Sequence, residues 1–93
     1  MTFEWDEEKE EANVAKHGVS FEEAKTILED PLYVDFYDPD HSQDEHRYIM
    51  IGLSNQGSLL IASYAGCNDM IRMITARQVT RSEREAYEEG QDK

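Results

Sequence analysis

The chain has 93 residues, a mass of 10.8 kDa and a formal net charge of −12 at pH 7. This length predicts one domain, residues 1–93. No apolar run approaches the roughly 18 residues that span a bilayer, which excludes a membrane-spanning helix. The single cysteine has no internal disulfide partner, and the first residues lack a secretory signal. Both features predict a protein of the reducing cytoplasm.

The acidic charge is distributed unevenly along the chain. Residues 1–46 hold fifteen acidic and three basic side chains, whereas residues 47–82 hold one acidic side chain and four arginines, a net charge of +3. Residues 83–93 hold five acidic and two basic side chains. The total charge argues against non-specific binding to nucleic acid, because contacts with phosphate need clustered Lys and Arg. The middle of the chain can still form a local cationic site.

Two helices are predicted near the N-terminus. Asp6 is a suitable N-cap for a helix that runs to about Lys16, and Gly18 can take the left-handed conformation that ends it. The segment Ser20–Glu23 is typical of a capping box, which predicts a second helix that ends at about Asp30, before a proline. Upstream of these helices, residues 3–5 form either a short edge strand or an anchor.

Beyond residue 31 the spacing of apolar residues changes from 3.6 to 2, which predicts strands. The expected strands are Leu32–Phe36, Arg47–Leu53, Leu59–Ala65 and Met70–Ala76. Thr80 opens another capping box for a last helix to about Glu89, which offers only Ala86 and Tyr87 to a core.

The predicted elements define a small α+β domain. It has two N-terminal helices, an antiparallel meander of three or four strands, and one C-terminal helix. We expect the helices to cover one face of the sheet and to leave the other face open.

The first helix carries a polar stripe made of Lys9, Asn13 and Lys16, with His17 at its edge. In one interpretation, the lysine stems cover the edge of the core and pair with acidic residues across helical turns. In the other, the stripe faces a cleft and binds a ligand.

Three arginines of the predicted strands allow two interpretations. Arg72 lies within an apolar strand, on the face predicted for Met70, Ile74 and Ala76, which is costly unless that face is open or the guanidinium is paired. Flat alternation places Arg77 on the opposite face, although a bulge would change this. With Arg47 they form either structural salt bridges or a phosphate-binding cluster, because the planar guanidinium suits phosphate oxygens.

Other chemistry has weaker support. The acidic segment 38–46 resembles a calcium loop, but Ser42 and Gln43 occupy positions that need other residues, so a solvated loop without metal is favoured. Cys67 has no obvious histidine partner to activate a nucleophilic thiol. The chain also lacks a P-loop and a Rossmann glycine pattern, and we expect no cofactor.

Several blocks of residues form a pattern that spans nearly the whole chain. The first block reads Phe3-Glu4-Trp5-Asp6-x-x-Lys9-x-x-x-Asn13-x-x-Lys16-His17-Gly18-Val19-Ser20-Phe21-x-x-Ala24. Later blocks are Glu45-x-Arg47, Ile51-Gly52 and Ile71-Arg72-x-Ile74-x-Ala76-Arg77, followed by Glu83 and Tyr87. Together these blocks resemble the BrnT toxin family.

The resemblance implies a RelE-like ribonuclease toxin of a type II toxin–antitoxin system, which cuts RNA without a metal and inhibits translation and growth. It also implies a BrnA-like ribbon-helix-helix antitoxin. The toxin would contact DNA only through this antitoxin. By hypothesis, Arg72 and Arg77 stabilise the reacting phosphate, and Arg47 supports them. Either Lys16 or His17 exchanges protons with the RNA. Lys9 and Asn13 position the RNA backbone.

The charge of −12 departs from the basic surface usual in toxins that cut RNA, and it should repel RNA at long range. A second hypothesis therefore stays open: a catalytically silent binding module of the same fold that only forms a complex with a partner regulator.

Overall fold

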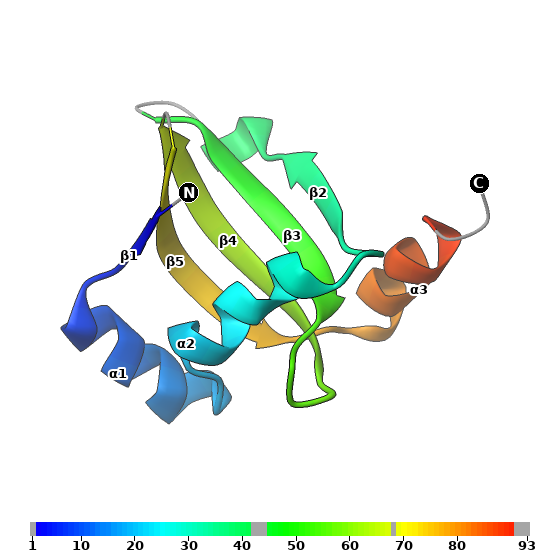
Figure 1. Cartoon of the computed structure of the whole chain (residues 1–93), viewed down its shortest axis with the longest axis horizontal. Helices are drawn as coiled ribbons and strands as arrows, with labels where there is room; N and C mark the ends of the chain where they lie inside the picture. The colour runs from blue at the N-terminus through cyan, green and yellow to red at the C-terminus, as the bar shows by residue number, and fades with distance from the viewer. Residues whose placement is uncertain (1, 42–44, 68, 91–93) are drawn as a thin grey trace.

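The computed structural model describes residues 2–41, 45–67 and 69–90, and Figure 1 shows a central sheet with helices packed around it. The elements in chain order are β1 (Thr2–Glu4), α1 (Glu7–His17), α2 (Phe21–Ala24), the 3₁₀ helix η1 (Lys25–Glu29), β2 (Val34–Tyr37), the 3₁₀ helix η2 (Pro39–His41), β3 (Arg47–Leu53), β4 (Leu59–Cys67), β5 (Met70–Gln78) and α3 (Arg81–Glu89). Within the described residues, no helix is long and apolar enough to cross a membrane.

The five strands form one mixed sheet in the order β1-β5-β4-β3-β2. Strands β2 to β5 are an antiparallel meander, but β1 pairs with β5 in parallel. The prediction of a purely antiparallel sheet of three or four strands is therefore corrected. Strand β1 has only three residues, too few for an alternating pattern to separate a strand from an anchor.

Helix α1 begins and ends where its capping residues predict. The Asp6 carboxylate accepts hydrogen bonds from the backbone N–H of Glu8 at 2.8 Å and of Lys9 at 3.4 Å. Gly18 has a φ of 72°, and its N–H donates to the Val14 carbonyl at 2.8 Å. Glycine adopts this left-handed conformation without steric cost, so the helix stops there.

The second predicted helix is shorter than expected, because α2 has four residues and continues as the 3₁₀ helix η1. Ser20 caps α2 as predicted, with its hydroxyl accepting from the Glu23 N–H at 3.0 Å. The Thr26 hydroxyl donates to the Glu23 carbonyl at 2.6 Å and accepts from the Asn55 N–H at 2.9 Å. These bonds hold the tighter turn against the hairpin between β3 and β4.

Both faces of the sheet carry a core, which corrects the expectation of an open face. On one face, β4 packs against α2 and η1 through Leu60, Ala62, Tyr64, Phe21, Ala24 and Ile27. On the other face, Ala86 and Tyr87 of α3 pack against Ile51, Leu59 and Ile61. The few apolar residues of α3 are therefore enough to dock it on the sheet.

A hydrogen bond also fixes α3 to the rest of the fold. The Tyr87 hydroxyl donates to Asp30 Oδ2 at 2.7 Å, and the same oxygen accepts from the Leu53 N–H at 2.9 Å. Burial and this bond to Asp30 raise the pKa of Tyr87 to about 12. Helix α3 therefore lies in a defined position, on the face that also carries the arginines.

Candidate functional site

Three arginines point to the α3 side of the sheet. Arg47 of β3 and Arg72 of β5 both pair with Ala65 of β4, and Arg77 pairs with Ile61. Paired residues share a face of an antiparallel sheet, and so do residues four apart along one strand. The spacing of the two β4 partners places Arg77 about 13 Å along the sheet from Arg72.

A β-bulge brings Arg72 and Arg77 to the same face. The register between β4 and β5 shifts so that the pairing skips Ile74. One extra residue reverses the alternation beyond it, so two residues five apart point the same way. Flat alternation would have separated them. The predicted shared face of Arg72 and Ala76 is wrong for the same reason, because Ala76 packs in the core beneath the helices.

Glu45 pairs with two of the arginines. Its Oε1 accepts a hydrogen bond from Arg72 Nη2 and lies 3.7 Å from Arg47 Nη2. Glu4 of β1 is the register partner of Arg72 on the other side of β5. Glu4, Glu45 and Arg72 line a cavity of about 90 Å³ together with Met70 and its neighbours. This end of β5 thus holds carboxylates and guanidinium groups within one small site.

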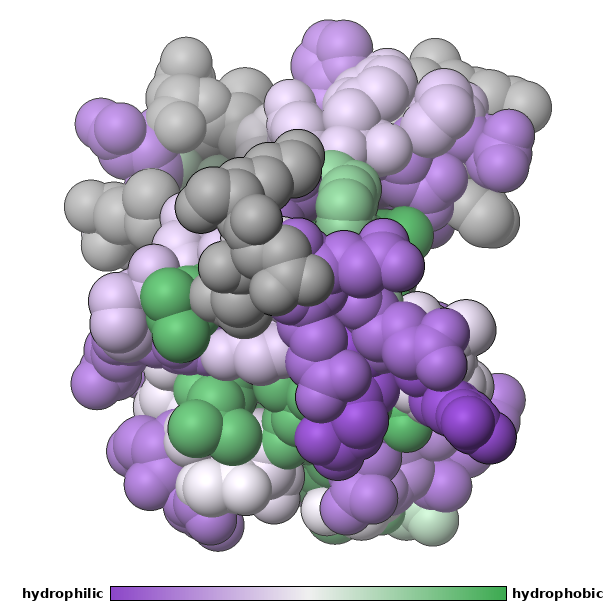
Figure 2. Space-filling view, turned by 90° about the vertical axis from the view of Figure 1, so that its right-hand side faces the viewer, coloured by the Kyte–Doolittle hydropathy of each residue, from purple (hydrophilic) through white to green (hydrophobic). Residues whose placement is uncertain are grey.

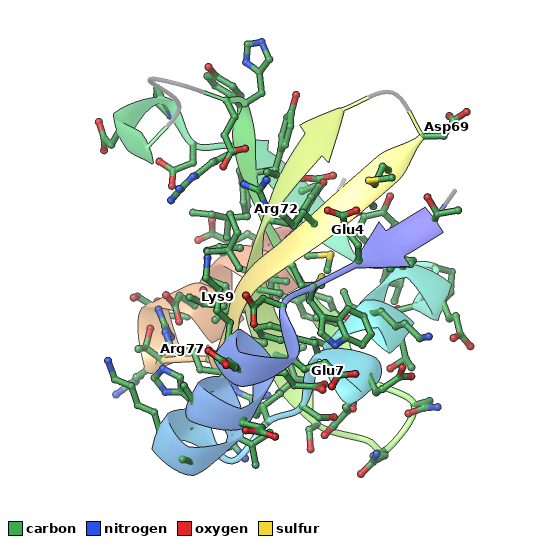
Figure 3. All side chains as sticks on the ribbon, turned by 90° about the vertical axis from the view of Figure 1, so that its left-hand side faces the viewer. Glu4, Glu7, Lys9, Asp69, Arg72 and Arg77 are labelled. Atoms are coloured by element: carbon green, nitrogen blue, oxygen red, sulfur yellow. The ribbon has the colours of Figure 1, made fainter. Side chains whose placement is uncertain are left out.

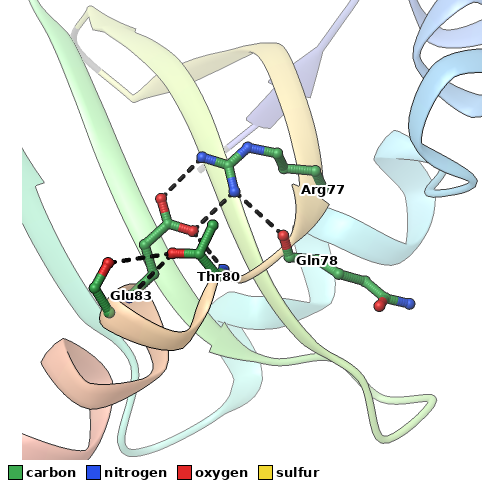
Figure 4. Close-up of polar contacts among 5 residues, drawn as sticks. Arg77, Gln78, Thr80 and Glu83 are labelled. Atoms are coloured by element: carbon green, nitrogen blue, oxygen red, sulfur yellow. Dashed lines mark hydrogen bonds and ion pairs between the residues drawn. The ribbon is translucent and has the colours of Figure 1, made fainter.

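Arg77 forms a bidentate ion pair with Glu83 at the start of α3 (Figure 4). Its Nη1 and Nη2 each donate to one carboxylate oxygen at 2.8 Å, and Glu83 Oε1 also accepts from the Thr80 N–H at 2.8 Å. The hydrogen bonds from Arg77 hold the pKa of Glu83 at about 2, and the bond to Glu83 raises the pKa of Arg77. The predicted capping box at Thr80 is confirmed, and its glutamate joins α3 to β5.

Replacing Glu83 with glutamine tests this pair. The folded-state pKa of about 2 lies below the ordinary value of 4.5, so the carboxylate stabilises the fold above pH 4.5 and loses this effect as the pH falls towards 2. Both side chains are partly exposed, so we expect Glu83→Gln to lower the free energy of unfolding by about 1–2 kcal/mol at pH 7. Urea denaturation should show less than half of that difference at pH 3. A difference that does not change with pH would contradict the assigned pair.

Helix α1 lies beside the part of β5 that β1 does not pair with, and it carries Lys9, Lys16 and His17. Asn13 bonds to Ala76 of β5, and Lys9, Lys16 and His17 each lie about one turn from it on the same side of the helix. Lys9 and Lys16 are exposed, and His17 is half-buried. Figure 3 shows Lys9 and the two labelled arginines on this side of the molecule. Helix α1, which carries these residues, is therefore bonded to the strand that holds Arg72 and Arg77.

Asn13 shares a side of α1 with Lys9 and Lys16, as predicted, but its side chain is buried, which corrects its predicted place in an exposed stripe. It is 7% exposed, and its Nδ2 donates to the Val19 and Ala76 carbonyls, both at 2.8 Å. Its Oδ1 accepts from the Ala76 N–H at 3.1 Å. The amide thus pairs with the edge of β5 as a neighbouring strand would, because β1 has already ended there.

The glutamates of the site were missed as functional residues. Glu45 and Glu83 stood out only as members of the family pattern, and Glu83 also as part of a capping box. The sequence held one signal for such pairing. Its 21 acidic side chains outnumber its nine basic ones, so salt bridges between the arginines and acidic residues were one of the two interpretations. The structure shows that pairing for all three arginines.

No group of three His, Cys, Asp or Glu side chains is arranged to hold a metal ion in the part of the chain that the structure describes. The predicted solvated loop at 38–46 lies partly outside that part, since residues 42–44 are not described. The charged groups that the structure does bring together are arginines, lysines and glutamates. They can bind an anion and exchange protons.

The fold and this site define a small α+β protein with three arginines, each paired with a glutamate, on one face of its sheet. The family model of the ribonuclease toxin BrnT, of type II toxin–antitoxin systems, matches residues 5–83. The chain therefore belongs to the BrnT family, as the resemblance of its sequence predicted. The family is one of ribonuclease toxins of type II toxin–antitoxin systems, which implies an RNA substrate and an antitoxin partner.

One solved structure supports the fold. The crystal structure of the Brucella abortus ribonuclease toxin BrnT is similar to this chain with a TM-score of 0.63 and 23% sequence identity. The similarity covers 87% of this chain and 99% of that chain. No curated protein matches the chain in sequence.

Proposed function

We propose that this protein is an endoribonuclease toxin that cleaves RNA without a metal ion, inhibits translation and growth, and is neutralised by a BrnA-like ribbon-helix-helix antitoxin. The proposal includes the RelE-like assignment of the fold, a cytoplasmic location, and contact with DNA only through the antitoxin. The observation that supports it best is the presence of three arginines on one face of a protein with a net charge of −12. Like charges gathered on one surface favour an anionic ligand such as phosphate.

The reaction we propose is attack of the RNA 2′-hydroxyl on the adjacent phosphorus. It forms a 2′,3′-cyclic phosphate, breaks the bond to the 5′ oxygen and leaves a 5′-hydroxyl. It needs a base for the 2′ proton, cations for the charge that gathers on the phosphate, and an acid for the leaving oxygen.

The residues of the site supply these roles in the proposal. Arg72 and Arg77 bind the phosphate oxygens through their planar guanidinium groups, with Arg47 in support. Either Lys16 or His17 exchanges protons with the RNA. The side chain of Lys9 positions the RNA backbone, whereas Asn13 contributes only by fixing α1 against β5.

A second candidate function is a silent binding module that forms the complex with the antitoxin but does not cleave RNA. It is favoured by the pairing of every arginine of the site with a glutamate. An incoming phosphate must compete with Glu45 and Glu83 for the guanidinium groups. The total charge of the protein also opposes the approach of RNA.

Expression of the chain alone in bacterial cells separates the two functions. We expect growth arrest together with RNA decay, both relieved by co-expression of the adjacent gene. Purified protein should then cleave RNA in the presence of EDTA and leave a cyclic phosphate. Normal growth and intact RNA at verified soluble expression would support the silent module instead.

A further inference from the structure

Strand β2 is an outer strand of the sheet, and within the described residues no strand pairs with its second edge. It pairs with β3 on one side and is the last strand in the sheet order. The Asp38 N–H donates to the Arg47 carbonyl at 2.9 Å, so the backbone groups of Val34 and Phe36 also face β3. The N–H and C=O groups of Asp35 and Tyr37 then point away from the sheet, available for another strand.

Next to this edge lies an apolar groove between β2 and α3. The groove has a volume of about 410 Å³, and its lining residues are Val34, Asp35, Phe36, Ala86, Glu89 and Gly90. Phe36 lines the groove and is 44% exposed, which makes it one of the well-exposed large apolar side chains of the described residues. Figure 2, seen from the α3 side, shows hydrophobic surface directly beside strongly hydrophilic surface.

The charged residues that line the groove, Asp35 and Glu89, are both acidic. Residues 29–40 and 85–90 contain eight acidic side chains and no Lys or Arg. An RNA strand would be repelled here, and a second copy of this chain would bring eight more acidic groups to the same surface. A partner that fits must combine apolar side chains with Lys or Arg.

The geometry points to this groove as the docking site for a basic, extended segment of the antitoxin, which adds a strand to β2. This inference rests on the proposed function for the existence of that partner. In such a complex the backbone of the segment bonds to Asp35 and Tyr37, and alternate side chains enter the groove beside Phe36. Its Lys or Arg side chains pair with Glu89, the acidic residue of α3 that lines the groove.

Helix α3 connects the groove with the arginine site. Ala86 and Glu89 line the groove, and Glu83 of the same helix holds Arg77. A segment docked in the groove therefore holds α3, and with it Glu83, against β5. Neutralisation would then keep Arg77 occupied without the partner covering it.

Affinity for the product of the adjacent gene tests the groove. We expect Phe36→Lys to weaken binding by about 30-fold or more, as for a buried interface anchor. Leu53→Lys is the matched control, because Leu53 is 46% exposed, close to the 44% of Phe36, and lies outside the groove. It should change the affinity by less than about threefold. Equal losses for the two variants would overturn the inference.

The backbone contact needs a separate pair of variants. Tyr37→Pro removes the outward N–H, which an edge strand tolerates, whereas Tyr37→Ala removes the same ring and keeps the N–H. We expect Tyr37→Pro to bind at least about tenfold more weakly than Tyr37→Ala, and the amides of Asp35 and Tyr37 to gain protection from hydrogen exchange in the complex. Protection confined to β5, or a dimer of the chain alone that Phe36→Lys disperses, would overturn the inference. Growth arrest by the chain alone tests the proposed function and does not involve the groove.

Discussion

Replacing Arg72 with alanine should slow RNA cleavage by about 10²- to 10³-fold, the loss that follows removal of one donor to a developing negative charge. The side chain of Arg72 is 45% exposed, so its removal leaves the core intact. We therefore expect the melting temperature and the affinity for the antitoxin to stay close to those of the unchanged protein. Single-turnover cleavage of a labelled RNA measures the effect.

Two further variants separate the geometry of Arg72 from its charge. Arg72→Lys keeps the charge but loses the planar fork, and it should recover only a small part of the activity. Arg81→Ala makes the same change in net charge at a residue that is 94% exposed on α3, and it should leave the cleavage rate nearly unchanged. A similar loss in Arg81→Ala would show that the total charge matters, and not the site at β5.

Replacing Asn13 with alanine should lower the free energy of unfolding by about 2–4 kcal/mol. The change removes three hydrogen bonds to the backbone at Val19 and Ala76 and leaves a buried N–H of β5 without its acceptor. For a domain of this size we expect the melting temperature to fall by about 10–20 °C. Urea denaturation and a thermal melt measure both quantities.

The control for Asn13 is Lys16→Ala, a truncation at an exposed position of the same helix. It should change stability by less than about 0.5 kcal/mol. If Asn13 instead contacted RNA, its replacement would abolish cleavage at unchanged stability. That result would restore the role first predicted for it in the polar stripe.

The ion pairs of the arginines affect how the cleavage results for the arginine variants are interpreted. Glu45 holds two guanidinium groups at one end of β5, and Glu83 holds Arg77 at the other. In the proposed enzyme these carboxylates keep the arginines oriented until phosphate replaces them, and in the silent module they remain the final partners. The cleavage assay on the unchanged protein decides between these two states.

Several local features of this protein were predictable from its sequence. Asp6 and Gly18 set the ends of α1, Thr80 set the start of α3, and the alternating apolar pattern gave Arg47–Leu53 as β3 with its bounds correct. These features depend on backbone capping and on side-chain alternation within a few residues. The family resemblance also followed from the sequence, because its pattern joins several such blocks.

The arrangement of the residues in the site depends on the tertiary structure. The parallel pairing of β1, the bulge at Ile74, the burial of Asn13 and the docking of α3 on the second face all depend on residues far apart in the chain. A one-residue shift in register reverses the direction of every later side chain, and no local pattern marks where a strand takes up that extra residue. The arginines were therefore recognisable from the sequence, but only the pairing of β5 with β4 placed them on one face.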